Sequence, residues 1–346
     1  VNNLYWQILF TSQGTVYLKN AYYDTRAHCS VCPAVRLLAM IEGQVNVGKY
    51  CQIWFADNDE PAIAESLEYE YLLNRKDLVA PQFPYLITCP IPKPFAGKVP
   101  TFVSLVANIC DTASNSLRVI FNELDSSKEK KGFAVCVKNT YFPYKDQSLR
   151  LIEWIEIVHL LGADKIVFYP LYIHENMTKV LKYYERHGLV DITPTTLAGN
   201  QVNAPHFQYL YFKSLGSDWS RTLRNEILQL NDCFYKNMYK YNYIIPLDID
   251  EVIMPNTKND WTGLMSSILK ATSSESNISS YRVDVVMFPH CPNASLHEDV
   301  PTYMYMLQHI LKDKEFDIWV PPKSFCDTEM ILWVNNHAAM KGLDGN

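Results

Sequence analysis

The stretch Tyr243-Ile-Ile-Pro-Leu-Asp-Ile-Asp-Glu251 is an apolar run that ends in three acidic residues. Its first five residues, Tyr243–Leu247, are too few for a helix and mostly favour β-structure, so they predict a buried strand with the acidic residues at its carboxyl end. Open α/β sheets bind ligands at that edge. Because strand side chains alternate between two faces, Asp248 and Asp250 should leave the same side and converge on one point.

Two carboxylates that converge repel each other unless a cation or a shared proton lies between them. Hard divalent ions such as Mn²⁺ or Mg²⁺ take oxygen ligands, so Asp248 and Asp250 are candidate metal ligands beside a bound phosphate. An Asp-X-Asp sequence also occurs in solvated acidic turns, so its surroundings must decide between the two interpretations.

The chain has 346 residues, enough for two domains, and its 48% hydrophobic composition supports a packed core in each. Its 31 Lys and Arg against 37 Asp and Glu give a net charge of −6 without a long basic stripe, which argues against nucleic-acid binding. No apolar segment reaches the roughly 18 residues that span a bilayer. Either the protein is cytosolic or its targeting segment is not part of this sequence. The sequons at Asn176, Asn277 and Asn293 are compatible with a secreted glycoprotein.

Residues 1–125 have the pattern of short strands separated by Gly, Pro and Asn-Asp turn signals. This pattern favours an antiparallel sandwich, which we expect to form a smaller β-rich accessory domain. The polar segment Asp125–Gly132 predicts an exposed linker after it. The expected strands are Tyr5–Phe10, Val16–Ala21, Val35–Ile41, Gln52–Phe55, Tyr85–Thr88, Thr101–Ala107 and Leu117–Phe121.

From Phe133 the pattern changes to alternating strands and helices, which predicts an α/β domain over residues 133–346. Its βαβαβ run is typical of nucleotide binding but lacks a Gly-rich phosphate loop, so a divalent metal would have to hold the phosphates. The expected strands are Ala134–Val137, Lys165–Tyr169, one from Leu189 and Tyr281–Phe288; the expected helices are about Leu149–Leu161, Met177–His187, Trp219–Tyr239 and Thr302–Leu311.

Nine cysteines indicate an oxidising compartment, and the odd number leaves at least one without an intrachain partner. Cys29-Ser-Val-Cys32 has the spacing of half a zinc site, but no second half completes it. We therefore expect disulfides from this pair to partners such as Cys51, Cys89 or Cys110. Cys136 and Cys233 are expected to be buried free thiols.

Seven segments carry a further signal: Ala134-Val-Cys-Val-Lys138, Leu151-Ile-Glu-Trp-Ile-Glu156, Leu161-Gly162, Val180-Leu-Lys-Tyr-Tyr-Glu185, Gly188, Leu230-Asn-Asp-Cys233 and Ile245-Pro-Leu-Asp-Ile-Asp-Glu251. In this order, over most of residues 133–255, they resemble glycosyltransferase family 92, whose best-known members are metal-dependent β-1,4-galactosyltransferases. The resemblance implies a GT-A-type nucleotide-sugar-binding domain, Mn²⁺ or Mg²⁺ as cofactor and UDP-galactose as donor. The acceptor would be a galactose- or fucose-terminated glycan, extended in β-linkage.

The resemblance also implies a type II membrane protein of the Golgi lumen, whose N-terminal anchor would lie upstream of Val1. A homodimer is compatible with it. Some plant relatives carry a carbohydrate-binding module ahead of the catalytic part, so the β-rich domain either binds a sugar or is a structural lid or oligomerisation module.

Candidate donor-binding residues follow from the family's pattern. Lys138 and Asn139 follow the first strand, where GT-A enzymes hold the uridine, and Asp248 is expected to touch the ribose as well as the metal. Glu153 either binds the base or pairs with Arg150.

Helix Trp219–Tyr239 supplies a second set of candidates. Arg224, Asn231 and Asp232 either form a solvated helix face or line the site, as the match at Asn231–Cys233 suggests. A His after a late strand completes the metal shell in many GT-A enzymes, and His337 is similarly placed.

The catalytic base is not fixed by the pattern. Asp284 and Glu329 are the leading candidates, with Asp299 and Asp327 also following the metal motif. Two rival functions remain. Leu247–Val252 also fits the Asp-X-Asp-X-Val motif of haloacid-dehalogenase-type phosphatases, and the protein could instead bind sugars without turnover.

Overall fold

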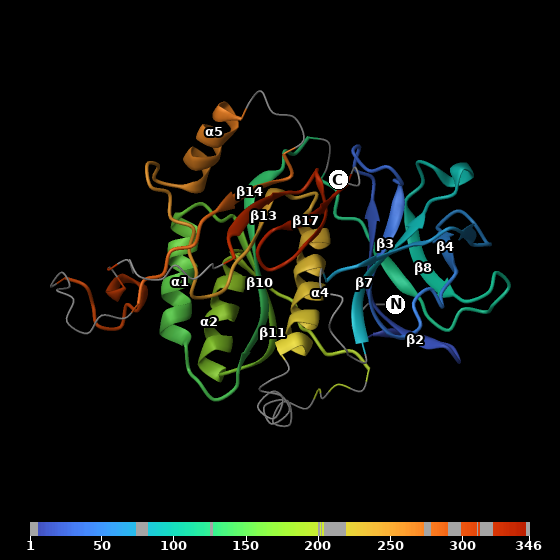
Figure 1. The fold of residues 1–346 in the computed structure, drawn as a ribbon, viewed down its shortest axis with the longest axis horizontal. Coiled ribbons are helices and arrows are strands. Elements are labelled where there is room, and N and C mark those ends of the chain that lie inside the picture. Colours follow the sequence, from blue (N-terminus) through green and yellow to red (C-terminus); the bar gives the residue numbers. More distant parts are fainter. Residues whose placement is uncertain are drawn as a thin grey trace.

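A computed structural model gives the fold of the chain (Figure 1). It describes residues 6–73, 82–124, 127–199, 201, 203, 219–272, 278–289, 299–309, 311 and 321–343, and their side chains except those of residues 219–222. The sequons at Asn277 and Asn293 and the start of the expected linker at Asp125 lie outside these residues. No helix within them is long and apolar enough to cross a lipid bilayer.

The first part of the described chain forms one nine-stranded sheet, in the order β5-β4-β8-β9-β2-β3-β7-β6, with β1 beside β2. Each strand expected here from the sequence is present, and β5 and β6 are additional. The elements are β1 (Gln7–Phe10), β2 (Gly14–Asp24), β3 (Ala34–Gly43), β4 (Tyr50–Phe55), β5 (Ala62–Ala64), β6 (Glu68–Tyr71), β7 (Gln82–Pro90), the 3-10 helix η1 (Lys93–Phe95), β8 (Pro100–Val106) and β9 (Leu117–Ile120).

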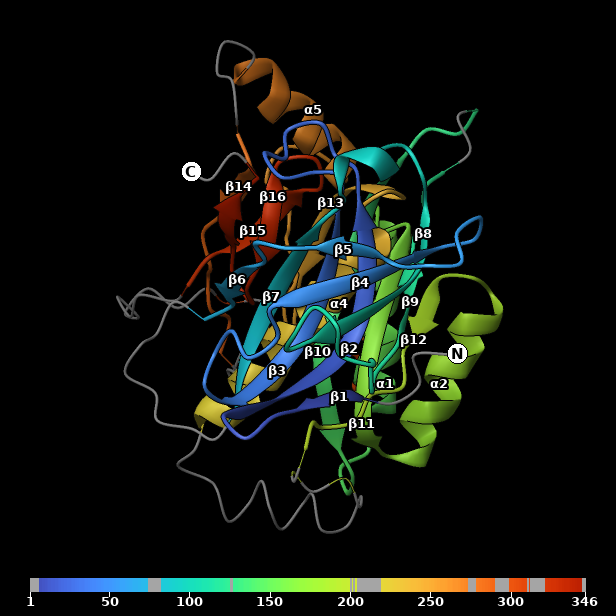
Figure 2. The same ribbon diagram turned by 90° about the vertical axis from the view of Figure 1, so that its right-hand side faces the viewer.

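This sheet curls over its own core. Strands β4, β5 and β8 cross over β2, β3 and β7 (Figure 2), and apolar side chains from both parts, such as Val16, Leu37, Ile53 and Leu105, are buried together. The expected antiparallel sandwich is therefore one curled sheet, whose two parts remain hydrogen-bonded through β8 and β9. The pair β2 and β9 runs parallel, and this pairing joins the two parts.

The second part forms a six-stranded sheet in the order β12-β11-β10-β13-β15-β14. The first four strands of this order are parallel, and β15 is antiparallel to its neighbours β13 and β14. The elements are β10 (Lys131–Phe142), α1 (Ser148–Leu160), β11 (Lys165–Ile173), α2 (Glu175–Arg186), β12 (Val190–Ile192), α4 (Trp219–Asn237), β13 (Tyr241–Pro246), α5 (Trp261–Ala271), β14 (Ser280–Val283), η2 (Met306–Gln308), β15 (Lys323–Asp327), β16 (Ile331–Val334) and β17 (Ala339–Gly342). The protein is thus mixed α/β, as the sequence predicts.

Strand β10 shows why this sheet is covered on both faces. Its side chains alternate, so Phe133, Val135 and Val137 pack with α1, α2 and α5, while Ala134 and Cys136 face α4. A strand that is apolar on both sides needs cover on both sides, which is the usual state of parallel sheets.

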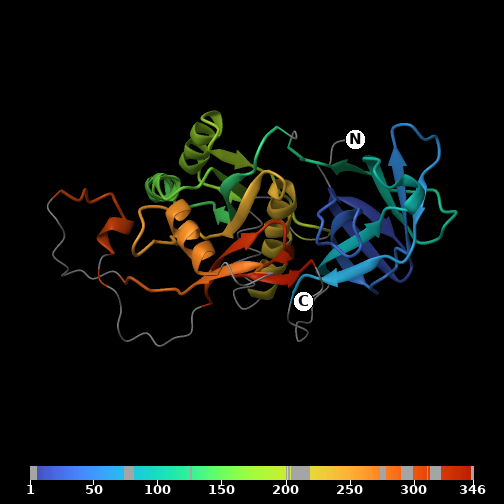
Figure 3. The ribbon, with the colours of Figure 1, turned by 90° about the horizontal axis from the view of Figure 1, so that it is seen from above.

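Helix α4 lies between the two sheets (Figures 1 and 3). Its Ile227, Leu230 and Phe234 share one buried cluster with Tyr22 and Leu38 of the first sheet. The two parts of the chain therefore share a core, because α4 packs against one face of each sheet.

The disulfides differ from the expectation. Cys136 and Cys233 were expected to be free thiols, but they are bonded to each other and join β10 to α4. Both sulfurs lie in the core between the sheet and the helix, where β10 and α4 pack closely, so a disulfide fits there as readily as two thiols.

The CxxC pair also differs. Cys29 bonds to Cys32 rather than to a distant partner, and Cys51 bonds to Cys89 across the curled sheet. Among the described cysteines, Cys110 and Cys326 are free.

Two other expectations are wrong in extent. The helix expected at Thr302–Leu311 is only the 3-10 turn Met306–Gln308, and the strand expected at Tyr281–Phe288 ends at Val283. Helix α5 was not expected, although Asp260 is a typical N-cap whose carboxylate accepts a hydrogen bond from the backbone nitrogen of Gly263 at 2.7 Å.

Candidate functional site

A cleft of about 420 Å³ lies at the carboxyl ends of the neighbouring parallel strands β10 and β13. Both strands deliver charged residues to it, Lys138 from β10 and Asp248 just after β13. The pairing of β10 with β11 shifts by one residue between Val137 and Asn139, and such a bulge turns the extra side chain, here Lys138, away from the regular alternation. The lining residues are Val137, Lys138, Asn139, Thr140, Phe142, Lys145, Gln147, Arg150, Asp248, Ile249, Asp250, Tyr305 and Met306.

Lys138 lies between two carboxylates. Its ammonium nitrogen is 3.4 Å from Glu226 of α4 and 3.3 Å from Asp248. Burial alone would lower the pKa of Lys138, but Glu226 and Asp248 together raise it. Burial raises the pKa of Glu226, and Lys138 partly opposes this. Lys138 is therefore firmly protonated and connects helix α4 to the acidic end of β13.

A second lysine, Lys323, approaches Asp248 from the other side. It begins β15, is only 3% exposed, and its ammonium nitrogen lies 2.7 Å from Glu251 and 3.7 Å from Asp248. It also donates a hydrogen bond to the backbone oxygen of Asn336 at 3.0 Å. Charges of opposite sign thus alternate through the site, in the order Glu226, Lys138, Asp248, Lys323 and Glu251.

The acidic segment forms a turn and does not continue the strand. Strand β13 ends at Pro246, and the backbone nitrogen of Asp248 donates to the carboxylate of Glu251 at 3.0 Å, while the nitrogen of Glu251 donates to the oxygen of Asp248 at 3.1 Å. Strand alternation therefore does not apply at Asp248 and Asp250. Asp248 is half-buried against the lysines, whereas Asp250 is exposed at the cleft.

His337 reaches the same group of charges from the loop between β16 and β17. Burial, then Lys323 and Lys138, lower its pKa to about 4, although Asp248 and the backbone of Pro322 act in the opposite direction. Its Nδ1 is buried and has no hydrogen-bond partner among the described residues. A neutral imidazole with a free buried nitrogen, close to a carboxylate, has the chemistry that a divalent metal needs.

Asn139, predicted as a donor-binding residue, also lines the cleft, and its Oδ1 is buried without a hydrogen-bond partner in the part of the chain that the structure describes. Glu153 does not pair with Arg150, one of the two roles expected of it. Its carboxylate accepts hydrogen bonds from the backbone nitrogens of Met306, at 3.0 Å, and Leu307, at 3.3 Å. It thereby holds η2 beside the cleft. Arg150 instead stacks on the ring of Tyr305, 3.4 Å from its centre.

Three predicted residues of α4 lie away from the cleft lining. Arg224 is buried over the ring of Phe83, and Asn231 exchanges hydrogen bonds with the backbone of Val334. Asp232 is buried between the two sheets, where it accepts hydrogen bonds from Tyr22, Tyr169 and Asn20. These contacts are structural. The helix does face the site, but through Glu226, which the sequence pattern did not single out.

The two leading candidates for the catalytic base lie at opposite ends of the sheet. Asp284 follows β14, whose Val283 pairs with Lys323, so it lies at the edge that carries Asp248 and is exposed. Glu329 follows β15 beyond Asp327, which pairs with Tyr243 near the amino end of β13. There its carboxylate forms an ion pair with Lys130. Its position does not support a role at the cleft.

A charged cleft at the carboxyl edge of a parallel sheet is where α/β proteins bind nucleotides and other phosphate compounds. Residues 131–345, which form this sheet, its helices and the β16–β17 hairpin, match the model of glycosyltransferase family 92. The match covers more than half of the chain, so the chain belongs to glycosyltransferase family 92, and its general activity is that of a glycosyltransferase. No curated protein matches it.

Proposed function

We propose that this glycosyltransferase is a metal-dependent, inverting galactosyltransferase with a GT-A fold, which transfers galactose from UDP-galactose to a glycan in β-1,4-linkage. The observation that carries the proposal is the arrangement of Lys138, Asp248 and Lys323 near the Nδ1 of His337, which has no hydrogen-bond partner among the described residues. The galactose donor and the linkage rest on membership of the family alone.

The residues present fit a divalent metal. The Nδ1 of His337 is unpartnered among the described residues, its imidazole is neutral, and Asp248 and Asp250 offer the hard oxygen atoms that Mn²⁺ or Mg²⁺ prefers. These three residues would hold the ion. When bound, the metal would neutralise negative charge on the diphosphate leaving group.

The lysines supply the other positive charges. Lys138 lines the cleft, is held by Glu226 and Asp248, and can also bind phosphate oxygens, a role that a Gly-rich loop plays in other nucleotide-binding folds. Lys323 is buried and compensates the charges of Glu251 and Asp248 from within the chain. Asn139, whose Oδ1 lacks a partner among the described residues, is placed to accept a hydrogen bond from the donor nucleotide.

Asp284 is our candidate for the base. It is exposed after β14, at the carboxyl edge, where an acceptor sugar can approach from solvent. Its carboxylate would take the proton from the acceptor hydroxyl as that oxygen attacks the anomeric carbon on the face opposite the diphosphate, which inverts the configuration.

The proposal is tested by incubating the protein with Mn²⁺, a glycan panel and one labelled donor at a time: UDP-galactose, UDP-glucose or UDP-N-acetylglucosamine. Transfer of label from UDP-galactose to galactose- or fucose-terminated glycans, into a product cleaved by a β-galactosidase, supports it. Transfer from another donor alone contradicts the donor assignment, and binding of glycans without any transfer would make the protein a sugar-binding member of the family.

The family also suggests a Golgi location with an anchor upstream of this sequence, and we propose this location as well. The disulfides Cys29–Cys32, Cys51–Cys89 and Cys136–Cys233 are consistent with an oxidising lumen.

A further inference from the structure

The loop that carries His337 closes a two-stranded hairpin, β16–β17, which is separate from the six-stranded sheet. On the side of the sheet, Ser324 donates a hydrogen bond to the backbone oxygen of His337 at 2.9 Å, and Lys323 donates to that of Asn336 at 3.0 Å. The side chain of Asn335 closes the loop by accepting from the backbone nitrogen of His337 at 2.7 Å. The place of the imidazole therefore depends on how the hairpin is held.

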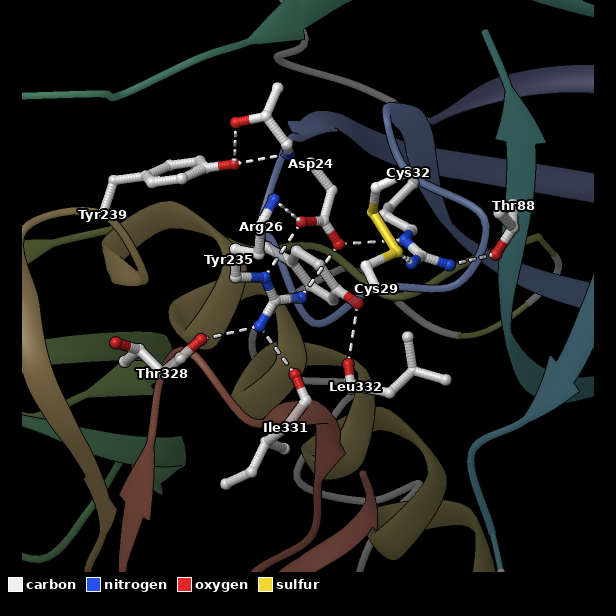
Figure 4. Close-up of a disulfide and its surroundings, with 12 residues drawn as sticks. Asp24, Arg26, Cys29, Cys32, Thr88, Tyr235, Tyr239, Thr328, Ile331 and Leu332 are labelled. Carbon is white, nitrogen blue, oxygen red and sulfur yellow. Dashed lines mark hydrogen bonds and ion pairs between the residues drawn. A yellow bond between two sulfur atoms is a disulfide. The ribbon is translucent and has the colours of Figure 1, made fainter. Parts of the chain in front are cut away.

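Arg26, in the loop that follows β2, binds the start of the hairpin (Figure 4). Its Nη1 donates to the backbone oxygens of Thr328 and Ile331, both at 2.7 Å. Its other side-chain nitrogens form a two-bond ion pair with Asp24, at 2.9 Å each, and Asp24 also binds Arg36. Because the guanidinium is fully buried and paired, it is a rigid connection between the two parts.

The Cys29–Cys32 disulfide supports this connection through its contact with Arg36. Arg36 donates to the sulfur of Cys29 at 3.0 Å and to the hydroxyl of Thr88 at 2.6 Å. The guanidinium of Arg36 is thus fixed between strand β7 and the disulfide loop, and it holds Asp24 in the orientation that Arg26 needs.

Glu70 of β6 binds both strands of the hairpin. One carboxylate oxygen accepts from the indole nitrogen of Trp333 in β16 at 3.2 Å, and the other lies 2.7 Å from the ammonium nitrogen of Lys341 in β17. Glu70 is half-buried, so this pair is less screened by water than a fully exposed one.

Each residue of β16 is bound by a side chain from outside the hairpin. Arg26 binds Ile331, Tyr235 donates to the oxygen of Leu332 at 2.7 Å, Glu70 binds Trp333, and Asn231 binds Val334. Arg26 lies in the loop after β2 and Glu70 lies in β6, whereas Tyr235 and Asn231 belong to α4. The hairpin is therefore held by side chains from both parts of the chain.

We propose that Arg26, in the loop after β2, and Glu70 of β6 are positioning residues for the transferase site: they hold the β16–β17 hairpin so that His337 stays beside the charged group around Asp248. The N-terminal sheet is then part of the scaffold of the site and not a separate module. The inference rests on the proposed function only where it treats His337 as a metal ligand.

The holding role is tested by hydrogen–deuterium exchange of the full chain, read from peptides that cover residues 331–343. Glu70→Ala should increase exchange there at least about tenfold, since both strands lose a partner. Glu70→Gln, which keeps an acceptor for Trp333, should have an intermediate effect. Arg26→Lys keeps the charge, but the three N–H groups of lysine cannot replace the four hydrogen bonds that Arg26 donates, so it should also increase exchange. Asp57→Ala, which removes the exposed ion pair with Lys98 in the same sheet, is the matched control and should change nothing.

The positioning role is tested with the same variants by calorimetric titration of Mn²⁺. The dissociation constant of Glu70→Ala should rise about tenfold, in the range seen when a group that orients a metal ligand is removed, and that of Asp57→Ala should not change. Unchanged exchange in Glu70→Ala and Arg26→Lys would overturn the inference, and so would increased exchange with an unchanged Mn²⁺ affinity. If the unaltered protein binds no Mn²⁺, the metal-dependent function fails, while the exchange experiment still decides whether Arg26 and Glu70 hold the hairpin.

Discussion

The ammonium nitrogen of Lys138 lies 3.3 Å from a carboxylate oxygen of Asp248. Lys323 approaches the same carboxylate from β15. The negative charge of Asp248 is therefore compensated within the chain, and the cleft carries positive groups of its own that can bind a diphosphate.

The role of Lys138 can be tested without any metal. Lys138→Met should raise the dissociation constant of uridine diphosphate about tenfold in the presence of a chelator, because one charge-assisted contact to phosphate is lost. Isothermal titration calorimetry measures this, with Lys98→Met, in the loop before β8, as the control. Equal affinities for the two variants would remove Lys138 from the donor site.

The two candidate bases give opposite expectations. Asp284→Asn should lower kcat by about 10² or more while leaving the dissociation constant of uridine diphosphate unchanged, because a positioned general base contributes that much. Glu329→Gln should leave kcat unchanged, since Glu329 pairs with Lys130 at the opposite end of the sheet. Steady-state kinetics decides between them, and a large loss in Glu329→Gln alone would reverse the assignment.

The sequence predicts the elements whose signal is local. Apolar runs between turn signals in the first 125 residues indicate strands, and the helical spacing from Leu151 to Val158 indicates α1, in which Leu151, Trp154, Ile155 and Val158 are buried and Ile152 is exposed. Helix α5 was missed because Gly263 and two serines weaken the helical signal of its sequence. The closure of the first sheet was missed because it depends on the parallel pair β2–β9, whose strands are far apart in the sequence.

In the candidate site, Asp248 could be found because it follows a buried strand. Lys323 and Glu226 could not be found in the same way, because the ion-pair partner of each lies more than 70 residues away in the sequence. The strand Lys323–Asp327 also contains Ser324 and Asp327, so its local pattern does not indicate that Lys323 is buried. Asp232 was misjudged because its partners Tyr22 and Asn20 lie in the first sheet, which was expected to be a separate domain.

The disulfide between Cys136 and Cys233 should stabilise the junction of β10 and α4. Cys136→Ala should lower the free energy of unfolding by about 3 kcal/mol, because the bond closes a long loop in the unfolded chain. Denaturant unfolding measures this, with Cys326→Ala, a buried free thiol, as a comparison that should cost less. Recovery of Cys136 as a free thiol in non-reducing peptide mapping of the native protein would contradict the pairing.

Acid should weaken the buried ion pairs of Asp24. Burial alone would raise the pKa of this carboxyl group, but Arg26 and Arg36 lower it to about 2. A group whose pKa is lower in the folded state adds stability above its unfolded pKa of about 3.9, and this contribution, about 2 kcal/mol, is lost as the pH falls from about 4 to 2. The difference in unfolding free energy between the unaltered protein and Asp24→Asn should therefore shrink over that interval. A difference that stays constant between pH 5 and pH 2 would show that Asp24 is not held in its charged form.

The metal site is the central claim, and titration of Mn²⁺ into the unaltered protein and into His337→Ala tests it most directly. We expect one site in the unaltered protein and an affinity at least about tenfold lower in the variant, because a ligand nitrogen has been removed while the fold, followed by circular dichroism, is kept. An equal Mn²⁺ affinity in the two proteins, or no binding to the unaltered protein, would contradict the account.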